Sequence, residues 1–236
     1  MRKVLFIIFF FTIVLCFGTQ ESHSFGKKPG TQIRRVRVLL VENKPTITIR
    51  VRGNYALRNT SSGKLFTKPD SSSLIFSKGK DGIDVSELQT GLKSVSVITG
   101  RIGAIVYKKN PIRGTVKIIL NRNGTLSMIN FIRLEEYLLG VIAPEIGKGA
   151  PFEAMKVQAV CARTYALYQM GIREKAPYDV ASDHRSQNYG GVRQESTLIA
   201  LAVQKTRGEY LSYRDRVLPS FYCTSCGGHT ENIRNV

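Results

Sequence analysis

The sequence predicts an α+β protein, with a β-rich N-terminal platform followed by a helical core around a long central helix. Three observations support this fold class. Residues 34–131 consist largely of short alternating or β-branched runs. From residue 134 onward, longer apolar runs with helical spacing replace them. Asn-Arg-Asn-Gly at 121–124 gives a hairpin signal near the end of the β-rich part, because Asn-Gly favours positive φ.

The strands of the platform follow from their period-two patterns. The predicted strands cover 34–41, 46–51, 74–76, 95–99, 115–120 and 126–131. Clusters of Ser, Lys and Gly at 59–63 and 77–82 mark loops between them.

The second half of the chain is predicted to be mainly helical. Expected helices cover 134–141, 151–170 and 194–205, and the last is stopped near Gly208. Two further strands are expected at 209–213 and 217–222.

The long helix over 151–170 has an unusual charge pattern. Pro151 suits its first position, because its φ is fixed and it lacks an N–H. One face is apolar and is formed by Phe152, Met155, Ala159, Val160, Leu167 and Met170. Lys156 and Arg163 lie seven residues apart on this same face. Either these cations serve a site, or they snorkel or pair with a structural carboxylate.

The N-terminus resembles an export signal. A basic start is followed by an apolar run through Gly18, and a helix over that run reaches about 22 Å, short of the roughly 30 Å hydrocarbon core. We expect a signal peptide or N-terminal anchor at 1–18 and a linker at 19–30. One domain then covers 31–236, with a β-rich part at 31–132 and a core at 133–236. The mature protein is expected outside the cytoplasm, with membrane contact only through an uncleaved N-terminus.

The formal net charge is +18. Such a charge favours nucleic acid, an anionic membrane surface or an acidic polymer as partner, and the export signal argues against nucleic acid. A merely solubilising surface is the alternative. No phosphate loop, dinucleotide fingerprint or HExxH motif is present in the sequence.

Cys223-Thr-Ser-Cys226 followed by His229 supplies half of a tetrahedral metal site. Zinc binding, a disulfide and free thiols all remain open for this pair. Cys161 lies inside the long helix and is expected in the core.

The segment from 134 to 230 resembles the SpoIID/LytB family of sporulation and amidase-enhancer proteins. The resemblance rests on blocks that occur in the family's order. They are Glu136-Tyr137, Gly140-Val-Ile142, Glu145-Ile146, Glu-Ala-Met-Lys-Val-Gln-Ala-Val-Cys-Ala-Arg-Thr-Tyr at 153–165, Ser-Gln-Asn-Tyr-Gly-Gly at 186–191, Ala202 to Gly208, and Ser-Cys-Gly-Gly-His-Thr at 225–230.

The resemblance implies an exported peptidoglycan lytic transglycosylase with Glu145 as its acid/base. The enzyme would cleave the MurNAc–GlcNAc bond of peptide-stripped glycan strands and leave 1,6-anhydro-MurNAc ends. One carboxyl group protonates the leaving oxygen and then takes a proton from the 6-hydroxyl. A hydrolase would need a second carboxylate, for which Glu153, Asp179 and Asp183 are candidates.

The resemblance further implies residues that contact substrate or organise the site. These are Lys156, Gln158, Arg163, Gln187, Tyr189, Tyr213 and Ser225. No cofactor is expected. Some relatives bind a metal near the Gln-Tyr block with Cys and His; here His184 is present, but no Cys lies between residues 178 and 191. The weak candidates for zinc are therefore Cys223, Cys226 and His229, by their own spacing, and His184.

Two rival functions stay open. The first is a non-catalytic wall-binding module that recruits or stimulates a peptidoglycan amidase. The second is a secreted structural β-domain that adheres to the wall by charge. The expected partners are therefore glycan strands and, by the amidase-enhancer name, a wall amidase. Glu145 favours the enzyme, because a pure binder has little use for it.

Overall fold

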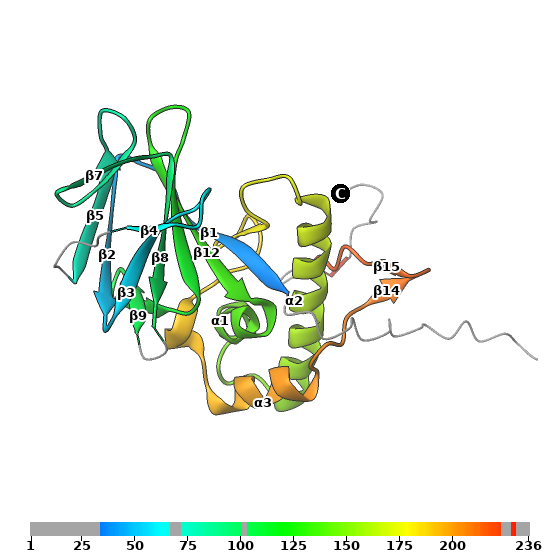
Figure 1. Ribbon diagram of the computed structural model, residues 1–236. Coiled ribbons are helices and arrows are strands. Elements are labelled where there is room, and N and C mark those ends of the chain that lie inside the picture. The colour runs from blue at the N-terminus through cyan, green and yellow to red at the C-terminus, as the bar shows by residue number, and fades with distance from the viewer. Residues whose placement is uncertain (1–33, 67–71, 101–102, 223–227, 230–236) are drawn as a thin grey trace, which may run out of the picture.

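A computed structural model describes residues 34–66, 72–100, 103–222 and 228–229 of the chain. The expected signal at 1–18 and linker at 19–30 lie outside these ranges. No helix within them is long and apolar enough to cross a bilayer. The described part combines a strand-rich N-terminal body with a cluster of helices, which confirms the predicted α+β class (Figure 1).

Two sheets make up the N-terminal body. The first contains β1 (Arg35–Lys44), β3 (Tyr55–Asn59), β4 (Leu65–Phe66), β8 (Ser94–Thr99), β11 (Thr115–Leu120), β12 (Leu126–Arg133) and β13 (Val180–Ala181). The second contains β2 (Thr46–Arg52), β5 (Ser73–Lys78), β6 (Ile83–Val85), β7 (Leu88–Leu92), β9 (Ala104–Tyr107) and β10 (Asn110–Ile112). Their orders are β13-β1-β12-β11-β8-β3-β4 and β10-β9-β2-β5-β6-β7.

The two sheets pack face to face and share one apolar core. Ile49 and Phe76 of the second sheet and Val97 and Ile118 of the first belong to it. Strand β2 alternates strictly between exposed and buried residues, as its period-two sequence predicts. Burial of one face of each sheet therefore fixes the register of the strands.

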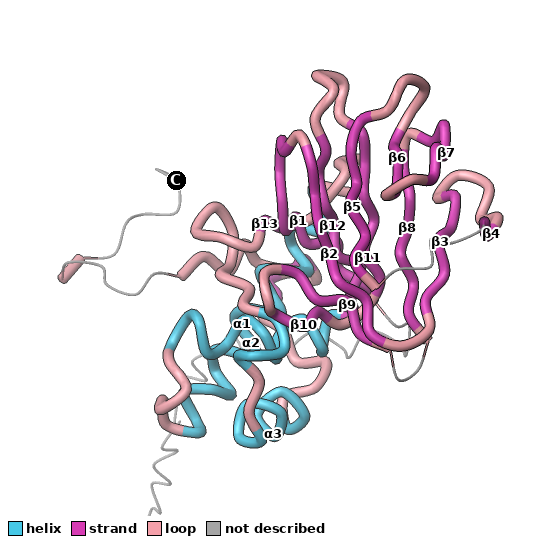
Figure 2. Tube along the Cα trace, turned by 90° about the vertical axis from the view of Figure 1, so that its left-hand side faces the viewer, coloured by secondary structure: helices cyan, strands magenta, loops and turns pink. Residues whose placement is uncertain are grey.

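The second core lies among the helices α1 (Leu134–Ile146), α2 (Phe152–Ile172) and α3 (Thr197–Lys205). In Figure 1, α2 is the long upright helix, with α1 against its inner side and α3 beneath. Figure 2 shows the helices gathered at one end of the strand-rich body. Strand β12 leads directly into α1, so the sheet positions the helix. A short 3-10 helix, η1 (Gly191–Gln194), packs on α1.

The six predicted strands of the platform all form. The turn between β11 and β12 is the expected one: the Asn121 N–H donates to the Thr125 carbonyl at 2.8 Å, and Gly124 has φ of 80°. The short strands β3, β4, β6, β7, β9 and β10 were not predicted. In place of the strands expected at 209–213 and 217–222, the structure has two strands of two residues each, β14 (Ser212–Tyr213) and β15 (Arg216–Val217).

Candidate active site

Glu145 lies in the last turn of α1, not in the break before the long helix. The Pro and Gly residues around Glu145 predict a short break between two helices at this residue, and this prediction was wrong, because α1 continues through Pro144 to Ile146. The break begins at Gly147, which has φ of 84°. The Glu145 side chain is half-buried, and its Oε1 accepts a hydrogen bond from the Asn188 N–H at 2.6 Å. Two blocks far apart in the sequence therefore meet at this carboxyl group.

Pro144 explains how the loop at 186–191 is fastened to α1. A proline inside a helix has no N–H to donate to the carbonyl four residues earlier, which here is Gly140. The Gly190 N–H supplies the missing donor to the Gly140 oxygen at 3.0 Å. Since both glycines approach without side chains, the loop backbone lies directly against the helix.

Tyr189 occupies the space that Gly140 leaves open. A Cβ at Gly140 would lie 2.6 Å from the Tyr189 ring. The same ring stacks on Tyr137, with centroids 5.3 Å apart and planes 28° apart. Burial raises the pKa of Tyr189 above its usual value. The structure thus places Tyr189 as a packing residue beside the site and also as a wall of a neighbouring hollow.

Gln187 is fully enclosed and connects three elements. Its Oε1 accepts from the Tyr137 hydroxyl at 3.1 Å, and its Nε2 donates to the Tyr222 hydroxyl at 2.8 Å and to the Ala162 carbonyl at 3.3 Å. Burial raises the pKa of Tyr222, the charge of Glu145 adds to the rise, and the bond from Gln187 opposes it. The site therefore combines one carboxylate with a buried amide and two tyrosine hydroxyls.

Arg163 is buried, with 1% of its side chain exposed, and it pairs with Glu135, so of the open alternatives the structure shows a structural carboxylate as its partner. Its Nε and one terminal nitrogen each bond a different Glu135 oxygen at 2.8 Å. The other terminal nitrogen donates to the Glu209 carbonyl at 3.0 Å. This geometry makes Arg163 a clamp between α1, α2 and the segment after α3.

Lys156 and Gln158 take different positions on α2. Lys156 is half-buried, its Nζ lies 6.0 Å from the ring centroid of Phe152 on the predicted apolar face, and it pairs with the exposed Glu153 at 2.8 Å. Gln158 is 9% exposed, and its Nε2 is buried without a hydrogen-bond partner. Cys161 is half-buried with a free thiol, so the expectation of a core position holds only in part.

The remaining candidates lie away from Glu145 or outside the described residues. Tyr213 is 48% exposed on β14. His184 and His229 are exposed. Ser225, Cys223 and Cys226 lie outside the described ranges. Within those ranges, no group of three His, Cys, Asp or Glu residues could hold a metal ion.

The comparisons with known proteins agree with this arrangement. The profile of the SpoIID family, described as Stage II sporulation protein, matches residues 122–213. This segment of the chain is therefore similar to the SpoIID family. The segment includes α1, α2 and the loop at 186–191, and so contains both Glu145 and its Asn188 partner.

Relatives span much longer chains. An uncharacterized protein of Brachyspira hyodysenteriae is 31% identical over 209 residues, covering 85% of this chain and 54% of the relative. Amidase enhancer of Bacillus subtilis is 34% identical over 99 residues, covering 42% of this chain and 13% of that protein. Stage II sporulation protein D of Bacillus subtilis is 30% identical over 154 residues, covering 59% of this chain and 43% of that protein. This chain therefore spans about half of the length of these relatives or less.

Sequence reasoning missed several residues of the site. Tyr222 was assigned only to a strand, and Tyr137 entered only as part of a motif. The Asn188 contact uses a backbone N–H, for which a side-chain type gives no signal. Pro144 inside an otherwise helical run was the signal available, because the carbonyl it frees must find a donor elsewhere.

Proposed function

We propose that this chain is an exported peptidoglycan lytic transglycosylase that acts on peptide-stripped glycan strands. The names of its relatives, Stage II sporulation protein D and Amidase enhancer, are consistent with cell-wall remodelling. The observation that supports the enzyme is the Glu145 carboxyl: one oxygen is held by Asn188, and Oε2 has no partner among the described residues.

The other carboxylates near the site support a mechanism with one acid. The three candidates for a second carboxylate are all engaged with cations: Glu153 with Lys156, Asp179 with Arg37 and Asp183 with Arg185. An inverting or retaining hydrolase would need one of them free, about 5–9.5 Å from the first. A lytic transglycosylase needs none.

In the proposed reaction, protonated Glu145 gives its proton to the glycosidic oxygen as the bond to C1 of the muramic acid breaks. The 6-hydroxyl oxygen of the same sugar then closes onto C1. Its proton passes to the Glu145 carboxylate, which restores the acid. The products are a free 4-hydroxyl on the leaving sugar and a 1,6-anhydro ring, without consumption of water. Tyr222 and Gln187 hold the surroundings of the carboxyl group rigid.

Mass spectrometry of products from purified glycan strands, with and without prior amidase treatment, tests this proposal. We expect anhydro ends only from the amidase-treated strands. Hydrolytic ends, or equal cleavage of untreated strands, would contradict it.

The second candidate is a non-catalytic module that stimulates a wall amidase, which the name Amidase enhancer favours. In that case Glu145→Gln would leave the stimulation of an added amidase unchanged, and no anhydro product would form. We further propose that either function is carried out on the outer side of the cytoplasmic membrane, which the apolar run at the N-terminus supports.

A further inference from the structure

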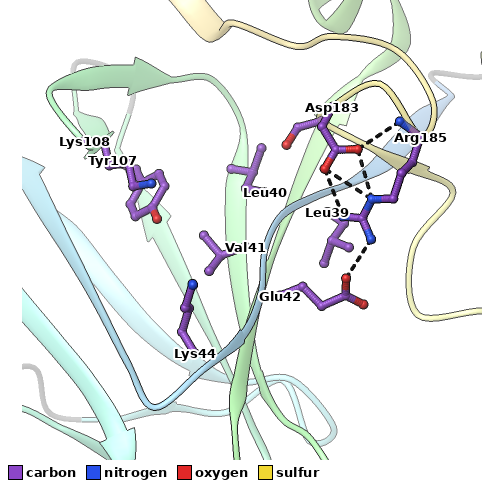
Figure 3. A pocket seen from close by; sticks show the side chains of 10 residues that line it. Leu39, Leu40, Val41, Glu42, Lys44, Tyr107, Lys108, Asp183 and Arg185 are labelled. Atoms are coloured by element: carbon purple, nitrogen blue, oxygen red, sulfur yellow. Dashed lines mark hydrogen bonds and ion pairs between the residues drawn. The ribbon is translucent and has the colours of Figure 1, made fainter.

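A polar hollow of about 300 Å³ lies along β1, outside the residues that surround Glu145. Four consecutive residues of β1, Leu39 to Glu42, line it. Successive side chains of a strand point to opposite faces, so four in a row line one hollow only if the edge of the strand faces it. Figure 3 shows Leu40 and Val41 on the side of Tyr107, and Glu42 on the side of Arg185.

Among the residues that the structure describes, no strand pairs with this edge of β1 from Leu40 to Lys44. On that side, β13 pairs with Val38 and Leu39 only, and the Ser182 N–H donates to the Leu39 carbonyl at 3.0 Å. Strand β1 then continues to Lys44 with β12 as its one paired strand among the described residues. Register shifts between Leu39 and Val41 and between Val41 and Lys44 bend this part of the strand, and Asn43 has φ of 54°, so its free edge is irregular. An unpaired strand edge is a template for a further extended chain.

The charges around the hollow favour an acidic occupant. Arg185 is already neutralised by Glu42 and Asp183, at 2.8 Å and 3.0 Å. Lys44 and Lys108 also line the hollow, and neither has a carboxylate partner within the described ranges. Lys108 is held at the tip of the β9–β10 hairpin in the left-handed conformation, with φ of 46°. Lys109 follows with φ of 66°, and positive φ at both central residues is what a two-residue hairpin turn requires, so the turn fixes where Lys108 lies.

We propose that the free edge of β1, from Leu40 to Lys44, binds an extended acidic peptide of a partner protein by strand addition. The chain's own first residues do not fit this charge, since residues 1–33 hold Arg2, Lys3, Lys27 and Lys28 against Glu21. Backbone hydrogen bonds would provide the pairing, and the two lysines would select acidic side chains.

The position of the hollow suggests a consequence for the site, which rests on the proposed function. A second hollow of about 260 Å³ shares Leu40, Tyr107, Lys108 and Ser182 with the first and extends to Tyr189 and Gly191. An occupant therefore contacts the loop whose Asn188 N–H holds Glu145. Peptide binding would steady this loop and so raise the rate of glycan cleavage.

A short synthetic peptide of alternating Glu and Val tests the proposal with the full chain. We expect saturable binding, and slower hydrogen exchange of the amides at 40–44 in its presence. The Lys44→Glu, Lys108→Glu double variant should bind about tenfold more weakly, as two exposed ion pairs allow. Lys80→Glu, an exposed lysine on the β5–β6 turn that does not line the hollow, is the matched control.

Three outcomes would overturn the proposal. They are no binding of the peptide, equal binding of a copy whose alternate amides are N-methylated, and protection of 40–44 by glycan fragments in place of the peptide. Repeating the binding with Glu145→Gln separates the two proposals. Unchanged affinity in that variant leaves the peptide site standing even if glycan cleavage is never observed.

Discussion

At the scale of single residues, Glu145 and Glu153 offer a direct comparison. Both are glutamates of the SpoIID segment, but Glu145 is half-buried against the 186–191 loop, while Glu153 is exposed and paired with Lys156. Only the first has the setting that an acid/base needs, so a change at each should separate chemistry from surface charge.

We predict that Glu145→Gln lowers glycan cleavage by about 10²- to 10⁴-fold, because the amide cannot transfer the proton. The shape is nearly retained, so the thermal unfolding midpoint should change little. Product formation is followed by mass spectrometry, with Glu153→Gln as the control that keeps near-normal cleavage. Normal turnover in Glu145→Gln would remove this residue from the mechanism.

Arg163 shows which features of the site could be predicted from the sequence and which could not. Its place on the apolar face of the helix predicted a desolvated charge that needs a partner, and burial confirms this. Glu135, 28 residues earlier, could not be identified as that partner. Sequence spacing gives the face of one helix, whereas the pairing depends on how α1 packs against α2. Glu135 also lies in the first turn of α1, where an acidic residue is favourable, so its sequence position gave no sign that it pairs with Arg163.

For Arg163→Ala we expect a loss of stability of about 3–5 kcal/mol, the usual cost of breaking a buried pair by removing one partner. Arg163→Lys should lose less, because it keeps the charge but not the paired donors to Glu135. Chemical denaturation of the two variants gives the comparison. Unchanged stability in Arg163→Ala would contradict the clamp between α1 and α2.

At the scale of elements, α1 depends on contacts that its own sequence does not reveal. The predicted helix ended at residue 141, whereas α1 continues to Ile146. The helix continues because Gly190 bonds the Gly140 carbonyl that Pro144 leaves free. The sheet shows the same limit. Strand β2 was predictable from its alternation, whereas β9 and β10 are too short to show a period.

Two helical glycines test this packing. In an exposed helix, Gly→Ala stabilises by about 0.4–1 kcal/mol, mainly through the unfolded chain. Gly171→Ala in α2 should do so, since nothing lies within 4 Å of its new Cβ. Gly140→Ala should instead destabilise the protein and lower cleavage, because its Cβ would meet the Tyr189 ring at 2.6 Å. Thermal unfolding and activity of both variants are compared. If Gly140→Ala stabilised the protein as much as Gly171→Ala, the 186–191 loop would have to move away from α1 without a loss of stability.

The tyrosines between α1 and the loop predict a loss of stability at alkaline pH. Burial raises the pKa of Tyr137, and likewise that of Tyr189, above the ordinary 10.0. The two tyrosines contribute fully to the free energy of unfolding below pH 10.0. This contribution is lost as the pH rises above 10.0, because their hydroxyls then lose protons in the unfolded chain but stay protonated in the folded one. The unfolding midpoint should therefore fall above this pH, and less steeply in Tyr189→Phe. An identical slope in that variant would exclude Tyr189 as a source.

At the scale of the whole molecule, the net charge of +18 bears on the choice of substrate. Amidase-treated strands expose a lactyl carboxylate on each muramic acid, and so form a polyanion that attracts a basic protein. Intact strands carry peptides at these positions. Local recognition at Glu145 and long-range attraction are separate contributions, because the second acts before any sugar reaches the site.

We therefore predict that affinity for peptide-stripped strands falls steeply as salt rises, since exposed charges are screened over about 8–10 Å at physiological ionic strength. Glu145→Gln permits the measurement, because it binds without cleaving in the proposed mechanism. Neutral chitin oligosaccharides, which lack the lactyl carboxylates, are the control and should bind with little dependence on salt. If both ligands respond equally to salt, the charge acts only to keep the protein soluble. If stripped strands alone respond, the charge of the protein contributes to the selection of peptide-stripped strands before any chemical step.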